Sequence, residues 1–287
     1  MLSRSVAIPT GVQPARLHTT RGEFAALVAE PAAASAGLYL LVPGFTGSKE
    51  DFVDLLPLLA QAGWKAVAYD QRGQYETPAG PGADLSLEAL AADARAVAMS
   101  AGADGDVHLL GHSFGGLVAQ AAVVRDPGAW TSVTLLCTGP GAFTDADGDT
   151  KRRDLARLRE LLVEQPMEVV QEIRERHDLS QGAAPPAPEV AKFLRERFLA
   201  SSPTAVSAHA GHLLEAPDQV DALAATDVAV TVIRGADDDA WSWAAQDDMA
   251  ARLNTRVVVV DDAAHSPSFE NPVALAAILT GLSSAAR

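Results

Sequence analysis

A serine enclosed by two glycines is the residue whose setting most strongly predicts chemistry in this sequence. Ser113 stands at the centre of segment 111–115, which has the pattern Gly-x-Ser-x-Gly. An apolar run at 107–110 precedes the pattern and another at 117–124 follows it. We therefore expect a strand, a sharp turn and a helix, an arrangement that holds a serine hydroxyl clear of the sheet while the glycines relieve crowding. The pattern predicts a nucleophilic serine.

A serine nucleophile also needs a base and an acid, and two later segments offer them. One apolar, strand-like run is followed by Asp237, Asp238 and Asp239, and the last such run is followed by His265. When the nucleophile lies on a strand–turn–helix, the chain order is serine, acid, histidine, each in a loop after a strand. The segments therefore predict a Ser-Asp-His triad. The residue types alone leave open which aspartate is the acid, because consecutive aspartates are also common in solvated turns.

Short apolar runs along the chain predict the sheet that positions these residues. Their continuous Val and Leu content is typical of parallel strands covered by helices on both faces. Such strands are expected at 37–43, 65–70, 106–111, 132–137, 228–234 and 256–261. An antiparallel hairpin is expected at the sheet edge, over 16–20 and 23–29. Helices are expected at 51–62, 86–100 and 114–125.

The pattern changes at about residue 141, where helical periodicity replaces strands. Helices are expected at 151–163, 167–176 and 189–199, with a Pro/Ala/Gly-rich connection at 181–188 and a more apolar stretch at 204–215. A helical insertion between strands commonly lies over the carboxyl ends of the strands, where α/β proteins bind ligands. The expected organisation is a core of 1–140 and 226–287 with a helical cap of 141–225.

With these features in place, the chain resembles the α/β-hydrolase superfamily, in its capped branch of esterases, lactonases and carbon–carbon bond hydrolases. The resemblance is most specific at Pro43-Gly44-Phe45, at Asp70-Gln71-Arg72-Gly73, at Gly111 to Gly115, and at Gly235…Asp238 with His265…Glu270-Asn271-Pro272. It implies an α/β-hydrolase fold with a mostly parallel eight-stranded sheet, helices on both faces and a helical cap. The family places its acid three residues after the glycine, which selects Asp238. It places its base at His265, although Ala264 stands where glycine is usual.

The resemblance also implies two backbone donors for an oxyanion. One is the N–H of Phe114, which follows the nucleophile at a helix start, where the helix dipole favours negative charge. The other is the N–H of Phe45, since Pro43-Gly44 stands where the family has His-Gly. Proline there removes a side chain that braces the loop but leaves the Phe45 N–H intact.

Four further residues are candidates for the substrate pocket. Trp241 and Trp243 follow the predicted acid closely, and His209 and His212 lie three apart in the expected cap. Packing is the alternative role for all four. His112 is expected to pack beneath the serine turn.

Composition narrows the class of protein. The 287 residues carry a formal net charge of −15, which argues against nucleic acid and anionic membranes as partners. Cys137 is the only cysteine, so an intrachain disulfide and a Cys-based metal site are excluded. The opening residues 1–6 lack a signal-like apolar stretch, and no apolar run reaches membrane-spanning length, so a cytoplasmic location is expected.

The sequence thus predicts a carboxylesterase-like serine hydrolase that acts on a small-molecule ester, lactone or thioester and needs neither cofactor nor metal. Hydrolysis of a carbon–carbon bond in a diketone by the same triad is one alternative. A non-hydrolytic biosynthetic lyase or cyclase, or a ligand-binding protein on the same fold, is another. In this fold, dehalogenases and epoxide hydrolases need Asp in place of Ser113, so the serine argues against them.

Overall fold

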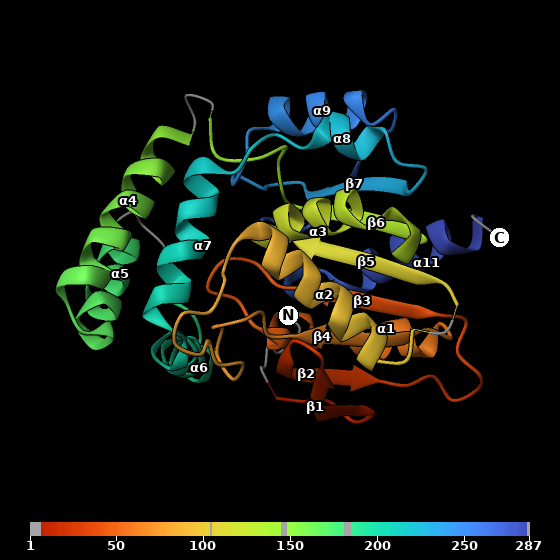
Figure 1. Ribbon diagram of the computed structural model, residues 1–287, viewed down its shortest axis with the longest axis horizontal. Coiled ribbons are helices and arrows are strands. Elements are labelled where there is room, and N and C mark those ends of the chain that lie inside the picture. The colour runs from red at the N-terminus through yellow and green to blue at the C-terminus, as the bar shows by residue number, and fades with distance from the viewer. Residues whose placement is uncertain (1–6, 104, 145–147, 181–184, 286–287) are drawn as a thin grey trace.

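A single eight-stranded sheet organises the molecule (Figure 1). The computed structural model describes residues 7–103, 105–144, 148–180 and 185–285. Residues 1–6 and positions 181–184 of the expected connection lie outside these ranges. Within the described residues, no helix combines the length and the apolar character that crossing a membrane requires.

The sheet is mostly parallel, as the sequence predicts. Its strand order is β1-β2-β4-β3-β5-β6-β7-β8, and only the pairs β1–β2 and β2–β4 are antiparallel. The strands are β1 (Val12–Thr19), β2 (Gly22–Ala29), β3 (Leu38–Val42), β4 (Lys65–Tyr69), β5 (Val107–His112), β6 (Ser132–Leu136), β7 (Ala229–Gly235) and β8 (Val257–Val260).

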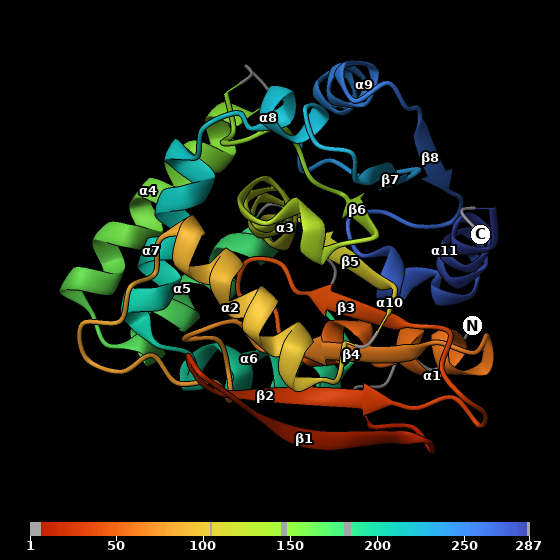
Figure 2. The same cartoon turned by 45° about the vertical axis from the view of Figure 1, so that its right-hand side comes forward.

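Helices cover both faces of the sheet, which explains the unbroken apolar runs of its central strands. Along β3, Leu40 packs into the core on one face, whereas its neighbours Tyr39 and Leu41 pack into the core on the other. The first core includes residues of α2 (Leu87–Ser100), α3 (Phe114–Arg125) and α9 (Trp243–Arg252). The second includes residues of α1 (Leu55–Gln61) and α11 (Pro272–Ala285). Figures 1 and 2 show α2 and α3 on one side of the sheet and α11 on the other.

The helix predicted over 51–62 is interrupted. A short 3₁₀ helix, η1 (Lys49–Phe52), comes first, and α1 begins only at Leu55. Ser48 caps η1 in a capping box with Asp51, and the side chain of Asp51 also binds Arg197 from a distant helix. These polar contacts fix the tight turn and separate it from the apolar helix that follows.

In the described part of the chain, four long helices and then a short one lie between β6 and β7. The long helices are α4 (Asp149–Glu164), α5 (Met167–Ser180), α6 (Pro188–Ala200) and α7 (Pro203–Glu215). They share a small apolar core that includes Leu158, Val170 and Phe198. Figure 1 shows these helices beyond the arrowhead of β5, at the carboxyl end of the parallel strands. The short helix α8 (Val220–Ala224) follows them and packs against α3 and α9 of the sheet layer.

Candidate active site

The turn between β5 and α3 holds Ser113 in a strained conformation. Its φ is 53° and its ψ is −120°, a region that side-chain-bearing residues rarely adopt. A Cβ at Gly111 would lie 2.2 Å from the carbonyl oxygen of Gly115, and one at Gly115 would lie 2.4 Å from the carbonyl oxygen of Val42. The tight approach therefore requires glycine at both positions, and it places Ser113 at the N-terminus of α3.

Three side chains from three loops meet at this turn. The Nε2 atom of His265 lies 3.0 Å from Ser113 Oγ, and its Nδ1 atom lies 2.8 Å from Asp238 Oδ1. Asp238 follows β7 and His265 follows β8, so all three residues stand beyond the carboxyl ends of parallel strands. Asp237 and Asp239 are exposed. Of the three consecutive aspartates, the one selected by family pattern is the one in contact with His265.

Hydrogen bonds keep the buried Asp238 ionised. Burial by itself favours the neutral acid, but hydrogen bonds from His265, Gln246 and the Ala240 N–H outweigh burial and hold the pKa of Asp238 below its ordinary value. The Gln246 side chain on α9 donates to Asp238 Oδ2 at 2.8 Å. An ionised Asp238 accepts the Nδ1 proton of His265, which leaves Nε2 to accept the hydroxyl proton of Ser113. The sequence carried no signal for Gln246.

The loop that carries His265 is fixed from two sides. Glu270 Oε2 accepts the backbone N–H groups of Ala264 and Ser266, at 2.8 Å and 2.9 Å. The ring of His112 contacts the same loop through a hydrogen bond to the His265 carbonyl. Burial, together with the nearby His265, lowers the pKa of His112 to about 4. His112 is therefore neutral at pH 7.

The loop after β3 carries Phe45, the expected oxyanion donor, and lies against the turn that holds Ser113. A Cβ at Gly44 would lie 3.2 Å from the Cβ of Ser113, so this loop touches the serine turn. Within the described ranges, the Phe45 N–H donates to no acceptor. The N–H of Phe114 is the first of α3 and has no acceptor within the helix. Both groups are available for a developing negative charge.

Two glutamine side chains hold the loop that carries Phe45. In this loop Pro43 stands at the position where the family has histidine. Gln71 Nε2 donates to the carbonyl of Pro43 at 2.9 Å, and Gln74 Nε2 donates to the carbonyl of Gly44 at 2.8 Å. Both side chains are buried. The turn after β4 thus braces this loop, which the Pro43 side chain cannot do.

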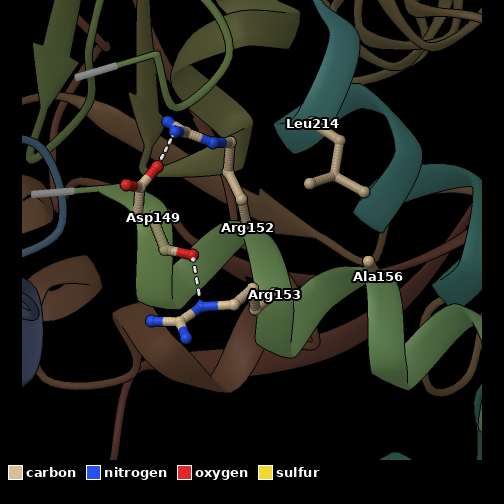
Figure 3. Close-up of a pocket in the computed structure, with 5 residues that line it drawn as sticks. All are labelled: Asp149, Arg152, Arg153, Ala156 and Leu214. Atoms are coloured by element: carbon tan, nitrogen blue, oxygen red, sulfur yellow. Dashed lines mark hydrogen bonds and ion pairs between the residues drawn. The ribbon is translucent and has the colours of Figure 1, made fainter. Parts of the chain in front are cut away.

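A cavity of about 330 Å³ opens at the serine and the histidine. Helix α6 of the insertion contributes Val190, Phe193 and Leu194 to its wall. The charged residues at this wall are Glu50, Asp51 and Arg197. A larger hollow of about 620 Å³ lies at α4 and α7 (Figure 3), and none of the three residues that meet at the serine turn lines it. In Figure 3 two arginines of α4 bind Asp149 of the same helix.

The two tryptophans proposed for the substrate pocket do not line the cavity at Ser113. Trp241 is buried, packs on the ring of Phe143 and donates its Nε1–H to the carbonyl of Gly141. Trp243 is about half exposed and donates its Nε1–H to the backbone carbonyl of Asp238 at 2.8 Å. These contacts give the tryptophans a packing role near Asp238.

The two cap histidines do not line that cavity either. His209 is buried, and its ring stacks on that of Phe114 with 4.7 Å between centroids. His212 donates from Nε2 to the carbonyl of Leu85 at 2.7 Å. Both therefore link α7 to the sheet layer.

Among the described residues, one trio of side chains of metal-ligand types lies close enough together to hold a metal ion. The ligand atoms of His112, Cys137 and His265 lie within 4.8 Å of one another. However, both nitrogens of His265 are hydrogen-bonded to other groups, and burial raises the pKa of the Cys137 thiol. Because metal binding needs a thiolate and a free nitrogen, this geometry favours the hydrogen-bonded chain from Ser113 to Asp238 over a metal centre.

Comparison with known proteins agrees with this architecture. A protein from Variovorax paradoxus described as the carbamate hydrolase RutD is 34% identical over 97 residues, an alignment that covers 34% of this chain and 36% of that protein. A crystal structure from Acinetobacter baumannii, described as that of a lipase, matches with a TM-score of 0.78 at 19% identity, covering 96% of this chain and 92% of that one. A carboxylesterase structure from Nitrososphaera gargenis matches with a TM-score of 0.76 at 22% identity, covering 95% and 98% of the two chains. The model of the alpha/beta hydrolase family matches residues 39–278, and the chain belongs to that family.

Proposed function

We propose that this protein is a serine hydrolase that cleaves a small-molecule carboxylic ester, lactone or thioester through an acyl-enzyme. The observation that carries the proposal is the continuous hydrogen-bonded chain from Ser113 Oγ through His265 to Asp238, with links of 3.0 Å and 2.8 Å. A serine hydroxyl is a weak nucleophile until such a base removes its proton. The likeness to esterase structures is consistent with this chemistry.

Each group then has a role in acyl transfer. Ser113 Oγ attacks the carbonyl carbon while His265 Nε2 accepts the hydroxyl proton. Asp238 stabilises the imidazolium that forms, and the N–H groups of Phe45 and Phe114 bind the oxyanion. His265 then gives its proton to the leaving group, which departs and leaves the acyl group on the serine. Water, deprotonated by His265, attacks the acyl-enzyme and releases the acid.

The helical insertion is proposed to act as the cap over this site. Helix α6 supplies apolar side chains to the cavity at the serine, which supports a core of 1–140 and 226–287 and a cap of 141–225. Near the end of that range, α8 packs against α3 and α9 of the sheet layer. A cavity of about 330 Å³ suits a small substrate, since ligand pockets commonly begin near this size.

Labelling and hydrolysis test the proposal. A fluorophosphonate should label the wild-type protein at Ser113, and short-chain p-nitrophenyl esters should be cleaved. Ser113→Ala should remain folded by circular dichroism, lose labelling and lose ester cleavage by at least ~10³-fold, as expected for removal of a nucleophile. A wild-type protein that resists labelling and cleaves no ester would contradict the proposal and favour a non-hydrolytic lyase, cyclase or ligand-binding protein.

Carbamate hydrolysis is a second candidate, because the aligned relative is described as a carbamate hydrolase. A carbamate carbonyl can be attacked by the same serine and held by the same N–H donors. Comparing kcat/KM for p-nitrophenyl esters, the matching p-nitrophenyl carbamates and a ring-cleavage diketone separates ester, carbamate and carbon–carbon bond hydrolysis. We expect the esters to be the best substrates of the three.

A further inference from the structure

Glu50 presents a buried carboxylate oxygen that the protein leaves unpaired. Its Oε1 forms an ion pair with Lys49 Nζ at 2.9 Å. Its Oε2 is buried and has no hydrogen-bond partner in the described part of the chain. The residue is 8% exposed, and it lines the same cavity as Ser113 and His265.

The other charged groups at this wall are already satisfied. Asp51 Oδ1 accepts from Arg197 at 2.5 Å, and Asp51 Oδ2 accepts from the N–H of Ser48 at 3.2 Å. Arg197 is therefore neutralised by its partner across the contact between α6 and η1. Of the charged side chains that line the cavity, Glu50 is left with a free acceptor.

The surroundings of Glu50 are negative overall. Lys49 Nζ also contacts Asp70 at 3.0 Å and Glu76 at 3.1 Å, so one ammonium group is shared by three carboxylates. Of these three contacts, the one with Asp70 is a hydrogen bond. Glu50 Oε2 has no donor among the described residues, so a donor for it has to come from a ligand.

A buried carboxylate oxygen without a donor is costly, and native structures rarely leave one unsatisfied. A ligand that donates a hydrogen bond at this point recovers that cost, whereas an apolar ligand of the same shape does not. Apolar side chains of α6, namely Val190, Phe193 and Leu194, line the same cavity. The cavity therefore combines apolar side chains of α6 with the carboxylate of Glu50 as a hydrogen-bond acceptor.

We propose that Glu50 Oε2 selects substrates that carry a hydrogen-bond donor, an ammonium or a hydroxyl, in the group held beside Ser113. This inference rests on the proposed function for its catalytic consequence, but donor binding by Glu50 does not depend on turnover. Glu50 is thus a specificity-determining residue and not part of the proton relay. A charge-assisted hydrogen bond in such a setting raises kcat/KM about 10- to 100-fold over a methyl group of the same length.

Matched esters test this selectivity. Each substrate carries a straight chain of three to eight carbons that ends in methyl, hydroxyl or ammonium. In one series, of p-nitrophenyl esters, this chain is the acyl group. In a second series, of acetate esters, it is the alcohol group. We expect the wild-type protein to prefer the hydroxyl and ammonium termini over methyl at one chain length. Glu50→Gln should abolish the preference for ammonium and keep part of that for hydroxyl, because an amide oxygen still accepts from a neutral donor. Glu50→Leu should abolish both preferences.

Glu76→Gln is the matched control. It removes a carboxylate from the same lysine, but Glu76 is partly exposed and does not line the cavity. It should keep the wild-type preferences, which separates loss of the acceptor from disturbance of Lys49. Damage to the fold would instead lower the rates for all three termini together.

A binding measurement keeps this inference separate from the proposed function. Isothermal titration calorimetry with Ser113→Ala needs no catalysis. The probes are 1-hexylamine, 1-hexanol and methyl pentyl ether, a control of similar size that has no hydrogen-bond donor. We expect the amine and the alcohol to bind more tightly than the ether, and the additional change Glu50→Leu to remove the difference. Equal binding of all three probes, or a donor preference that survives Glu50→Leu, would overturn the inference. Failure of ester cleavage alone would overturn only the proposed function.

Discussion

The Nε2 atom of His112 lies 2.6 Å from the backbone carbonyl oxygen of His265. His112 is the last residue of β5, directly before Ser113. His265 lies in the loop after β8, and β6 and β7 lie between β5 and β8 in the sheet. Because burial lowers the pKa of His112 to about 4, the ring is neutral at pH 7 and donates its Nε2 proton to this carbonyl. One hydrogen bond thus joins the turn that holds Ser113 to the loop that holds His265.

Removal of this donor should loosen the base without changing substrate binding. We expect His112→Leu to lower kcat about 10-fold, in line with the loss of one partly buried hydrogen bond, while KM changes little. His112→Gln retains an N–H donor and should recover much of the loss. Steady-state kinetics with a p-nitrophenyl ester measures both parameters. Unchanged kcat in His112→Leu would show that the contact does not position His265.

The three consecutive aspartates should differ sharply in their effect on catalysis. Asp238→Asn should lower kcat by about 10³- to 10⁴-fold, because an amide cannot hold the productive tautomer of His265 or stabilise its cation. Asp237→Asn and Asp239→Asn change exposed side chains and serve as controls with near wild-type kcat. If either control lost as much activity as Asp238→Asn, the assignment of the acid would be wrong.

Much of the sheet can be predicted from sequence because its central strands are covered on both faces. Continuous apolar runs located these strands to within about two residues. The first edge strand was predicted too short: β1 begins at Val12, whereas the sequence indicated residue 16. Pro14 argues against a strand in general, but an edge strand pairs on one side and tolerates proline. The apolar character of α11 on all sides hides its helical periodicity, and that helix was not predicted.

The residues of the candidate triad could also be predicted, because each follows a strand in a motif of fixed spacing. The groups that support them could not. Gln246 reaches Asp238, and Gln74 reaches the carbonyl of Gly44. Neither has a local pattern, since each contact joins elements whose approach is set by packing of the whole chain. The same applies to Glu50, whose significance comes from an oxygen left without a partner.

The glycines of the serine turn should be intolerant of a single methyl group. In Gly115→Ala the new Cβ would meet the backbone oxygen of Val42 at 2.4 Å, so the turn must shift. We expect the free energy of unfolding in urea to fall by about 1–3 kcal/mol, with a loss of fluorophosphonate labelling at Ser113. Gly128→Ala is the control, since a Cβ there meets nothing within 4 Å. Equal stability of the two variants would contradict this account of the turn.

The buried ring of His209 should make stability fall in mild acid. Burial, and then the nearby His212, lower the pKa of His209 to about 3, whereas an unfolded histidine titrates near 6.5. As the pH falls below about 6.5, His209 binds a proton in the unfolded chain but not in the folded chain. The free energy of unfolding therefore falls progressively toward pH 3. Between pH 7.5 and pH 5.0, urea unfolding should show the wild-type protein losing about 2 kcal/mol more than His209→Gln. His18→Gln, at a largely exposed side chain, should track the wild-type protein, and an identical pH dependence in His209→Gln would mean that this ring is not held neutral by burial.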